Sequence, residues 1–410
     1  MQDSDDDKAR ELPKMRLIYK HAAVTIVASV AKSATKGFLH HVEEKYDYFI
    51  DPVTIPIPTT KTSFKQPNII LSYPADYKRW KDPINDRAWT FQELLLSTRA
   101  ILFSYRGVQF FDRTAPTAAD GLTSGKDPQL PNLPWSGKMF SLATNPENTR
   151  QVWLAVRGEY SRRALSYQRD KLLAIAAVAE ELGRKYRSRY FAGMWERDLA
   201  MDLQWNCPRD QNGSGKKPMR RPRSHDYVAP SWSWASVDGA VEDFVHVWED
   251  EGDDGGIGLK DMLGFEVISC DVTLTVPDFA YGSVTSGSLI VKGRICSFVW
   301  RPHKDDDFHN SLDSDGFLAT KLDTPTSLYS ELKCGEATID ALDSGLKDSA
   351  VVTCLATRLM ENVPGRQDVE GLMLLPANKM EYRRVGFFRL TGPSGLTMFD
   401  SRDMQEMTIV

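Results

Sequence analysis

The sequence predicts an α/β region at the N-terminus, a helical segment in the middle and a β-rich region over the C-terminal half. Three patterns carry this prediction. Apolar residues at helical spacing lead directly into a short β-branched run, a second helical periodicity lies near the centre, and short alternating runs dominate after residue 262. A length of 410 residues with 41% hydrophobic side chains allows more than one buried core.

The first predicted elements are a helix and a strand. Apolar residues recur at helical spacing, and Pro13 either sets the first turn of this helix or bends it. The spaced residues are Leu12, Met15, Ile18 or Tyr19, and Ala22. The run at 23–28 follows almost without a break and is typical of a strand that is buried on both faces. A helix followed by a buried strand is half of an α/β crossover unit.

The next predicted elements follow an irregular connection over 51–84, which is rich in Pro and Thr. Asp86 is placed to cap a helix that runs to residue 96. The runs at 100–104 and 108–111 predict two strands of a hairpin, because an Arg-Gly turn separates them.

The remaining chain divides by composition and periodicity. The residues that trace the apolar face of a central helix are Leu172, Ile175, Ala176, Ala179, Leu182 and Tyr186. The runs after residue 262 predict an antiparallel sheet or barrel. The predicted divisions are an α/β region at 1–113, a linker or surface excursion at 114–150, a helical region at 151–205, charged loops around a Trp-rich strand at 206–261, and a β-rich domain at 262–410.

Composition excludes several classes of function. The formal net charge of -5, from 51 Lys+Arg and 56 Asp+Glu, is too balanced for a nucleic-acid surface. No apolar run approaches the roughly 20 residues of a membrane helix, and the acidic start lacks a secretory signal. The five cysteines include no C-x-x-C pair, so we expect neither a disulfide framework nor a zinc site. We therefore expect a cytoplasmic protein that binds no nucleic acid, spans no membrane and requires no metal or cofactor.

One helical turn carries the candidate chemistry. In the segment W-T-F-Q-E, Trp89 and Glu93 lie four residues apart and share a helical face. An indole beside a carboxylate lowers the local dielectric and raises the pKa of the carboxyl group. Such a carboxylate could stabilise an oxocarbenium-like transition state in glycosidic or N-glycosidic cleavage. The alternative, which spacing alone favours, is a core Trp89 and a Glu93 paired with a base such as Arg87 or Arg99.

Two further groups of residues are candidates for binding. Period-two alternation in 229–236 places Trp232 and Trp234 on one face of a predicted strand. The two indoles form either a stacking platform for a sugar or base or, as we prefer, a pair packed against a neighbouring helix. His303 and His309 flank three aspartates and in principle hold a metal, but a polar surface loop is the preferred interpretation.

Several of these blocks together resemble the fungal heterokaryon-incompatibility (HET) domain family. The segment at 15–28 resembles the middle of the domain, as does the Gln-Asp-Ser block that begins at Gln2. The segment at 87–97 resembles its closing R-x-W-T-x-Q-E-x-x-L-S motif. Downstream blocks resemble the region that follows the domain in many members. They are Tyr160-Ser161-Arg162, Asp170-Lys171-Leu172, Tyr190 with Ala192-Gly193-Met194-Trp195, and the P-S-W-S-W-A-S block at 230–236.

The resemblance implies a fold similar to Toll/interleukin-receptor (TIR) and flavodoxin-like α/β domains. The family's domain begins further upstream than Gln2, so we expect a truncated HET domain at 1–113 whose parallel sheet has an unpaired edge. The family's last strand often closes with an aromatic-x-Cys pair, and Asp112 stands where this Cys is expected.

The resemblance also implies a function in non-self recognition and cell-death signalling, through protein partners or self-assembly. Some TIR domains hydrolyse NAD with a Glu four residues after a Trp, and Trp89 and Glu93 match this spacing. An NAD glycohydrolase with Glu93 as the catalytic carboxylate, Trp89 in support and NAD as the substrate is therefore the alternative function. An inactive, truncated remnant is a third interpretation. The residues that would bind a cofactor stay unassigned.

Overall fold

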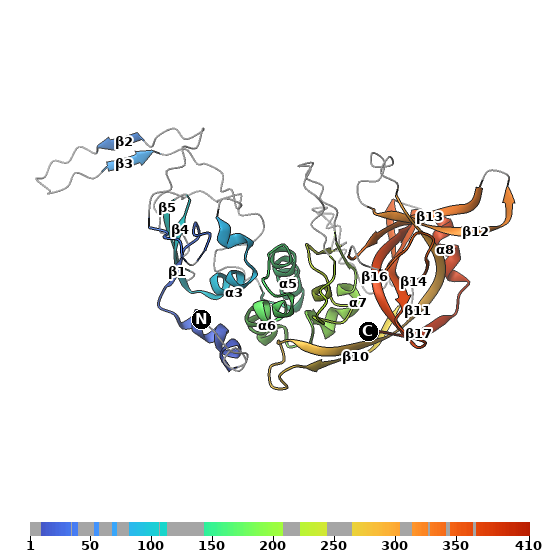
Figure 1. Cartoon of the computed structure of the whole chain (residues 1–410), viewed down its shortest axis with the longest axis horizontal. Helices are drawn as coiled ribbons and strands as arrows, with labels where there is room; N and C mark the ends of the chain where they lie inside the picture. The colour runs from blue at the N-terminus through green and yellow to red at the C-terminus, as the bar shows by residue number, and fades with distance from the viewer. Residues whose placement is uncertain are drawn as a thin grey trace, which may run out of the picture. The chain divides into compact units, whose positions relative to one another are not determined.

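The structure is a computed structural model of the whole chain, and the chain forms two compact units (Figure 1). Unit 1 comprises Met1–Arg16 and Ala143–Val410, and unit 2 comprises Leu17–Leu142. The structure describes residues 10–33, 35–39, 53–56, 68–71, 82–105, 107–112, 143–207, 222–243, 265–303, 314–326, 329–341, 345–363 and 366–410. Each unit is described by itself.

Unit 2 contains a three-stranded sheet with the order β1-β4-β5. The strand β1 (Thr25–Val27) runs parallel to β4 (Arg99–Ser104), and β4 forms an antiparallel hairpin with β5 (Gly107–Asp112). The mixed α/β character and the hairpin are therefore confirmed. A second pair, β2 (Val53–Pro56) with β3 (Asn68–Leu71), lies in the stretch that the sequence predicted to be irregular.

The predicted helix is present as α3 (Ala88–Leu96), and its Leu94 packs on this sheet. Its start differs from the prediction, because Asp86 lies inside a preceding 3-10 turn, η3 (Pro83–Asp86), and does not cap the helix. Thr90 instead fixes the corner between η3 and α3. Its hydroxyl lies 2.8 Å from the carbonyl oxygen of Ile84 and 2.9 Å from that of Arg87.

The strand β1 is buried on one face only, so the prediction of a strand covered on both faces is wrong. Val27 is 5% exposed and packs with Leu94 of α3, whereas Ile26 is 63% exposed. The physical reason is that α3 covers one face of the sheet, and among the described strands only β4 pairs with β1. The β-branched run therefore predicted the strand correctly but predicted its burial on both faces wrongly.

The helical part of unit 1 contains α5 (Pro146–Ser161), α6 (Leu173–Tyr186) and the short α7 (Leu199–Asp202). The helix α5 begins inside the stretch predicted to be a linker. The side chain of Asn145 caps it by accepting a 2.8 Å hydrogen bond from the Asn148 N–H, and Pro146 occupies the first turn. The predicted apolar face of α6 is buried throughout.

The N-terminal residues of unit 1 contribute a 3-10 turn, η1 (Leu12–Lys14), and the start of α2 (Met15–His21). Pro13 lies in the first turn, which is one of the two positions that the sequence left open for it. Arg16 is buried and pairs with two carboxylates of α6, Glu180 at 2.9 Å and Glu181 at 3.1 Å.

The Trp-rich segment at 229–236 is not a strand, which corrects the sequence prediction. Trp232 lies in a turn and Trp234 begins a 3-10 turn, η6 (Trp234–Ser236), because the Ser233 hydroxyl accepts a hydrogen bond from the Ala235 N–H and bends the chain. Both indoles are fully buried, and Trp234 packs edge-on against Tyr160 of α5. Packing against a helix, the preferred interpretation, is confirmed for Trp234, and neither ring is open to a ligand.

The C-terminal part of unit 1 is a closed barrel (Figure 1). The sheet path ends at β14 (Val351–Val363), which pairs back onto β11 (Val284–Pro302) through Ile295 to Val299 and closes the ring. The intervening strands are β12 (Gly316–Thr326), β13 (Tyr329–Ile339), β16 (Glu381–Leu390) and β15 (Arg366–Pro376). The outer strands β10 (Glu266–Leu274) and β17 (Met404–Ile409) pair with β11. The predicted β-rich region is confirmed as a barrel.

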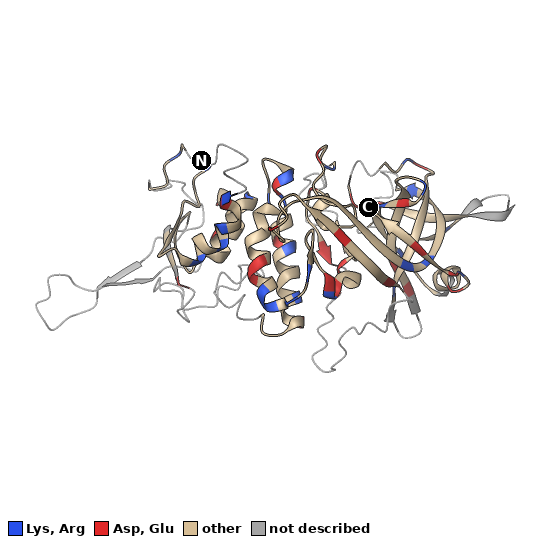
Figure 2. Cartoon of the chain, turned by 90° about the horizontal axis from the view of Figure 1, so that it is seen from below, with Lys and Arg blue, Asp and Glu red and all other residues tan. Residues whose placement is uncertain are grey.

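The helix α8 (Pro393–Asp400) packs against the barrel interior through Phe399, whose ring lies 6.0 Å from Phe388 and 6.3 Å from Phe298. Basic and acidic residues are interspersed on the helices and the barrel strands (Figure 2), in keeping with the small net charge. Among the described residues, no helix has the length and apolar character needed to cross a membrane.

Candidate functional site

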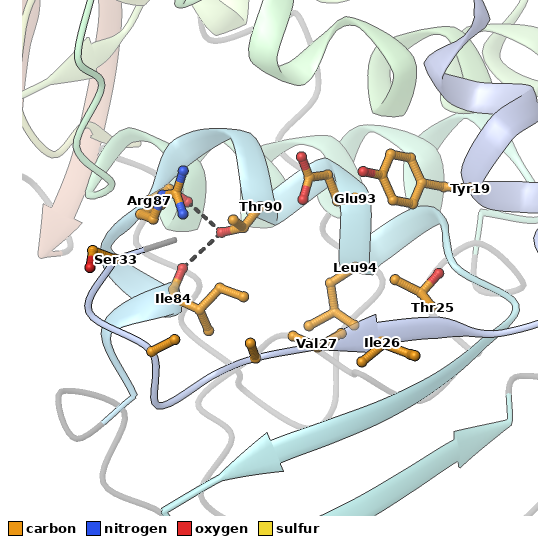
Figure 3. A pocket seen from close by; sticks show the side chains of 12 residues that line it. Tyr19, Thr25, Ile26, Val27, Ser33, Ile84, Arg87, Thr90, Glu93 and Leu94 are labelled. Atoms are coloured by element: carbon orange, nitrogen blue, oxygen red, sulfur yellow. Dashed lines mark hydrogen bonds between the residues drawn. The ribbon is translucent and has the colours of Figure 1, made fainter. Parts of the chain in front are cut away.

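Unit 2 contains a pocket of about 220 Å³ around the predicted residue Glu93 (Figure 3). Its walls come from α2, from β1 with the loop after it, and from η3 and α3. The lining residues are Tyr19, Thr25, Ile26, Val27, Ala28, Ala31, Ser33, Ile84, Arg87, Thr90, Glu93 and Leu94. The pocket therefore combines an apolar floor with a small number of polar side chains.

The position of Glu93 follows from the packing of α3. Leu94 contacts Val27, Ala100 and Leu102 in a small core on the covered face of the sheet. Because Glu93 is the preceding residue on the helix, its side chain lies beside this contact and at the pocket (Figure 3). The contacts of the Thr90 hydroxyl hold the corner between η3 and α3, and Arg87, the residue at this corner, lines the same pocket.

The carboxyl group of Glu93 is half-buried, and burial raises its pKa. Two neighbours oppose this rise: the Tyr19 hydroxyl, by a hydrogen bond, and the Arg87 guanidinium, by its charge. The pKa of the Tyr19 phenol is raised as well, because the phenol is partly buried and the negative charge of Glu93 lies nearby. The Tyr19 hydroxyl points toward the Glu93 side chain (Figure 3). Protonated Tyr19 is thus a hydrogen-bond donor to ionised Glu93.

The second predicted site residue, Trp89, is half-buried on the same helix. It is not one of the described residues that line the pocket. Glu93 therefore has Tyr19 and Arg87 as its polar neighbours there, and Trp89 does not form the pocket wall. Arg87 is one of the two bases that the alternative interpretation named. The other, Arg99, forms an ion pair with Asp112 at 3.0 Å on the β4–β5 hairpin.

Sequence reasoning missed Tyr19 as a site residue. Its spacing places it on the apolar stripe of the first helix, and no local pattern links position 19 to position 93. The contact exists only because α2 and α3 both border β1 in the folded chain. The hydroxyls of Thr25 and Ser33 were missed for the same reason.

The other predicted candidates are not brought to this pocket. His303, directly after β11, lies 3.0 Å from the Ser314 hydroxyl and 3.1 Å from the Glu336 carboxylate, and His309 lies outside the described residues. Within the described ranges, no group of His, Cys, Asp and Glu side chains has the arrangement of a metal site. Trp232 and Trp234 belong to the core of unit 1.

The geometry defines a small pocket on an α/β unit, with an apolar floor and a few polar side chains, able to hold a hydroxyl-rich or cationic group against one carboxylate. One family model matches the part of the chain that contains most residues of this pocket. The family model for heterokaryon incompatibility protein (HET) matches residues 1–93, and this confirms the resemblance over the stretch that runs from the N-terminus to Glu93. Comparisons with curated proteins and with solved structures gave no match.

Proposed function

We propose that this chain acts in a heterokaryon-incompatibility response, as a non-self recognition and cell-death signalling protein whose α/β unit works by self-assembly. The observation that carries the proposal is the HET match over residues 1–93. This stretch supplies β1, in which Ile26 is 63% exposed, and Val24 directly before the strand is 40% exposed. A strand edge with apolar side chains and no described partner is a template for pairing with another chain.

A second copy of the same chain is the partner that this edge fits. Two identical edges present the same unpaired backbone groups and the same apolar side chains to each other. Their antiparallel pairing forms a two-fold contact, in which a residue i of one copy meets a residue j of the other and residue j of the first copy meets residue i of the second. We also propose that the α/β unit has a TIR-like fold.

Substituting Val24 by Lys tests the assembly. A charge beside an edge strand opposes pairing with another strand, and Val24, which directly precedes β1, does not line the Glu93 pocket. The wild-type chain is expected to form oligomers in light scattering and to reduce viability when expressed in a filamentous fungus, whereas Val24→Lys is expected to be monomeric and harmless.

Val351→Lys is the matched control, since Val351 is 62% exposed on β14 and far from β1 in sequence. It should assemble and kill like the wild type. A monomeric wild-type chain at micromolar concentration, or oligomers of Val24→Lys equal to those of the wild type, would contradict the proposal.

A second candidate function is NAD glycohydrolysis at Glu93, which the pocket geometry favours. Cleavage of the N-glycosidic bond to nicotinamide leaves positive charge on the ribose, and the ionised carboxylate of Glu93 would stabilise that charge. At about 220 Å³ the pocket is smaller than the roughly 300–1,000 Å³ of a drug-sized ligand, so it would take only the nicotinamide-ribose end of NAD. NAD is here a substrate, and no resident cofactor is proposed.

Nicotinamide release from NAD by the wild type, Glu93→Gln and Glu266→Gln decides this candidate. Glu266 is exposed on β10, so its variant should keep the wild-type rate. Glu93→Gln should lose the activity without a lower Tm, because burial already disfavours the charged form of Glu93 in the folded chain. Equal rates for wild type and Glu93→Gln would remove Glu93 from the mechanism. Absence of both assembly and hydrolysis in the wild type would favour the third interpretation, an inactive remnant.

A further inference from the structure

The barrel of unit 1 gathers thiols that the sequence keeps far apart. Cys296 lies on β11, Cys334 on β13 and Cys354 on β14, and all of them are free thiols. Cys354 is fully buried in the barrel core, and the other two pack against that core as partly buried side chains. Their thiols are close enough for the charge of each one to affect the pKa of another. No C-x-x-C spacing marks this group, because it is assembled by strand pairing.

Two of these cysteines lie directly opposite each other. In the antiparallel pairing of β11 with β14, Cys296 is the register partner of Cys354. Directly opposite residues of an antiparallel pair have Cα atoms about 4.5–5.5 Å apart, and disulfides span Cα distances of about 4.4–6.8 Å. Register partners point to the same face of a sheet, and here both side chains belong to the inner core. The backbone is therefore already placed for a bond between them.

The position of this pair in the fold is distinctive. The pairing of β11 with β14 is the contact that closes the barrel, and it extends only from Ile295 to Val299 on β11. Cys296 and Cys354 lie within this short seam. A covalent bond there would tie the two ends of the sheet path together.

The two thiols differ in access and in surroundings. Cys296 is half-buried and receives a hydrogen bond from the side chain of Arg402, whereas Cys354 has no exposed surface. Burial raises the pKa of both thiols, and Arg402 lowers that of Cys296 by a smaller amount. Cys296 is therefore the thiol that a small oxidant reaches first, and its reaction should become faster as the pH rises.

We propose that Cys296 and Cys354 form a disulfide in the presence of a hydroperoxide and that this bond locks the barrel seam. The Cys296 thiolate attacks one peroxide oxygen, the O–O bond breaks, and a sulfenic acid forms as hydroxide leaves and is protonated to water. The Cys354 thiolate then attacks the Cys296 sulfur, so the S–S bond forms and the S–O bond breaks with loss of a second water. The two thiols lose two electrons in total, and hydrogen peroxide is reduced to two waters.

Cys334 provides the matched control. Its thiol contacts the Leu332 carbonyl oxygen at 3.3 Å and the Thr320 hydroxyl at 3.7 Å, so its polar partners lie on β13 and β12. It is not a register partner of either cysteine in the seam. The proposal therefore assigns the disulfide to Cys296 and Cys354 and leaves Cys334 reduced.

The test treats the full chain with hydrogen peroxide at pH 7 and pH 8.5 and identifies disulfide-linked peptides by mass spectrometry without reduction. The wild type and Cys334→Ser should each lose two free thiols per chain and yield the Cys296–Cys354 peptide pair, faster at pH 8.5. Their Tm should rise by about 5–10 °C and return after dithiothreitol, because the bond closes a long loop of the unfolded chain.

Cys296→Ser and Cys354→Ala should show neither the peptide pair nor the shift in Tm. Cys354→Ala keeps a small apolar side chain in the core, and Cys296→Ser tests the same bond at a half-buried position should the core variant fail to fold. An unchanged thiol count in the wild type, or a peptide pair that contains Cys334 in place of either seam cysteine, would overturn the proposal.

Discussion

Replacing Arg384 by Met is the sharpest test of how unit 1 holds together. Arg384 lies on β16 with no exposed surface, and its Nε lies 3.0 Å from a carboxylate oxygen of Asp340. Its two terminal nitrogens donate to the carbonyl oxygens of Leu203, at 2.5 Å, and Trp205. The guanidinium carbon also lies 3.6 Å from the centroid of the Trp205 ring. One side chain thus joins the barrel to the segment that follows α7.

The expected loss of stability follows from what the substitution leaves behind. Methionine fills a similar volume but donates no hydrogen bond, so the Asp340 carboxylate stays buried and keeps the more distant Arg223, at 3.7 Å. Removing one partner of a buried ion pair costs about 3–5 kcal/mol, because the remaining charge is desolvated without compensation. The carbonyl groups of Leu203 and Trp205 lose donors as well. We therefore expect the free energy of unfolding to fall by about 3–5 kcal/mol, a large part of a typical total.

Urea unfolding followed by tryptophan fluorescence measures this loss. Arg189→Met, which removes a surface ion pair with Glu196 at 3.4 Å, is the matched control and should unfold at the wild-type midpoint. The double variant Arg384→Met/Asp340→Asn should lose less than the sum of its single variants, because the buried charge is then absent. A loss below about 1 kcal/mol for Arg384→Met, or additive single effects, would refute this account of the network.

Three further predictions concern packing, pH and the pocket. Gly193→Ala should lower the Tm by several degrees, because Gly193 has a φ of +100° and an added Cβ would lie 2.6 Å from Nε1 of Trp234; an unchanged Tm would contradict the packing. Burial raises the pKa of Asp202 to about 6 from 3.8, so the folded chain holds more protons between these values and the free energy of unfolding should fall as the pH rises through them. Asp202→Asn should flatten that slope in urea titrations at several pH values, and an unaltered slope would exclude Asp202 as its source. Thr90→Val should cost about 1–2 kcal/mol in urea unfolding, because it removes the hydroxyl that contacts two carbonyls at the start of α3, whereas a neutral effect would place the helix start elsewhere.

The parts of the fold that were predicted correctly are those with a local cause. The hairpin of β4 and β5 follows from two short runs with a turn between them, and α6 follows from a stripe of apolar residues at helical spacing. The prediction of a strand at 229–236 was wrong because period-two alternation is also compatible with a turn. The Ser233 hydroxyl favours the turn by accepting a hydrogen bond from a backbone N–H. A side-chain contact of this kind leaves no periodic signal.

The candidate site was predictable to the same extent. The helical spacing that marks Glu93 is local, so the residue and its neighbour Arg87 were found together. Tyr19 and the pair of Cys296 with Cys354 were not found, since each depends on which elements pack or pair after folding. Trp89 was expected beside Glu93 from spacing alone, but spacing fixes only a shared helical face and not the wall of a pocket.

The two candidate functions of unit 2 depend on the same strand, and this makes their tests informative about each other. Thr25 to Ala28 supply part of the pocket wall, and Ile26 both lines the pocket and is 63% exposed. A strand added to the edge of β1 would therefore border the pocket and remove water from the side of Ile26, where exclusion of water strengthens the interaction of Glu93 with a developing positive charge. Assembly through β1 would then support hydrolysis, while Glu93 would not be needed for assembly. If hydrolysis depends on assembly in this way, Glu93→Gln should still form oligomers and monomeric Val24→Lys should hydrolyse NAD slowly. Hydrolysis by the Val24→Lys monomer at the full wild-type rate would show that the two functions are independent.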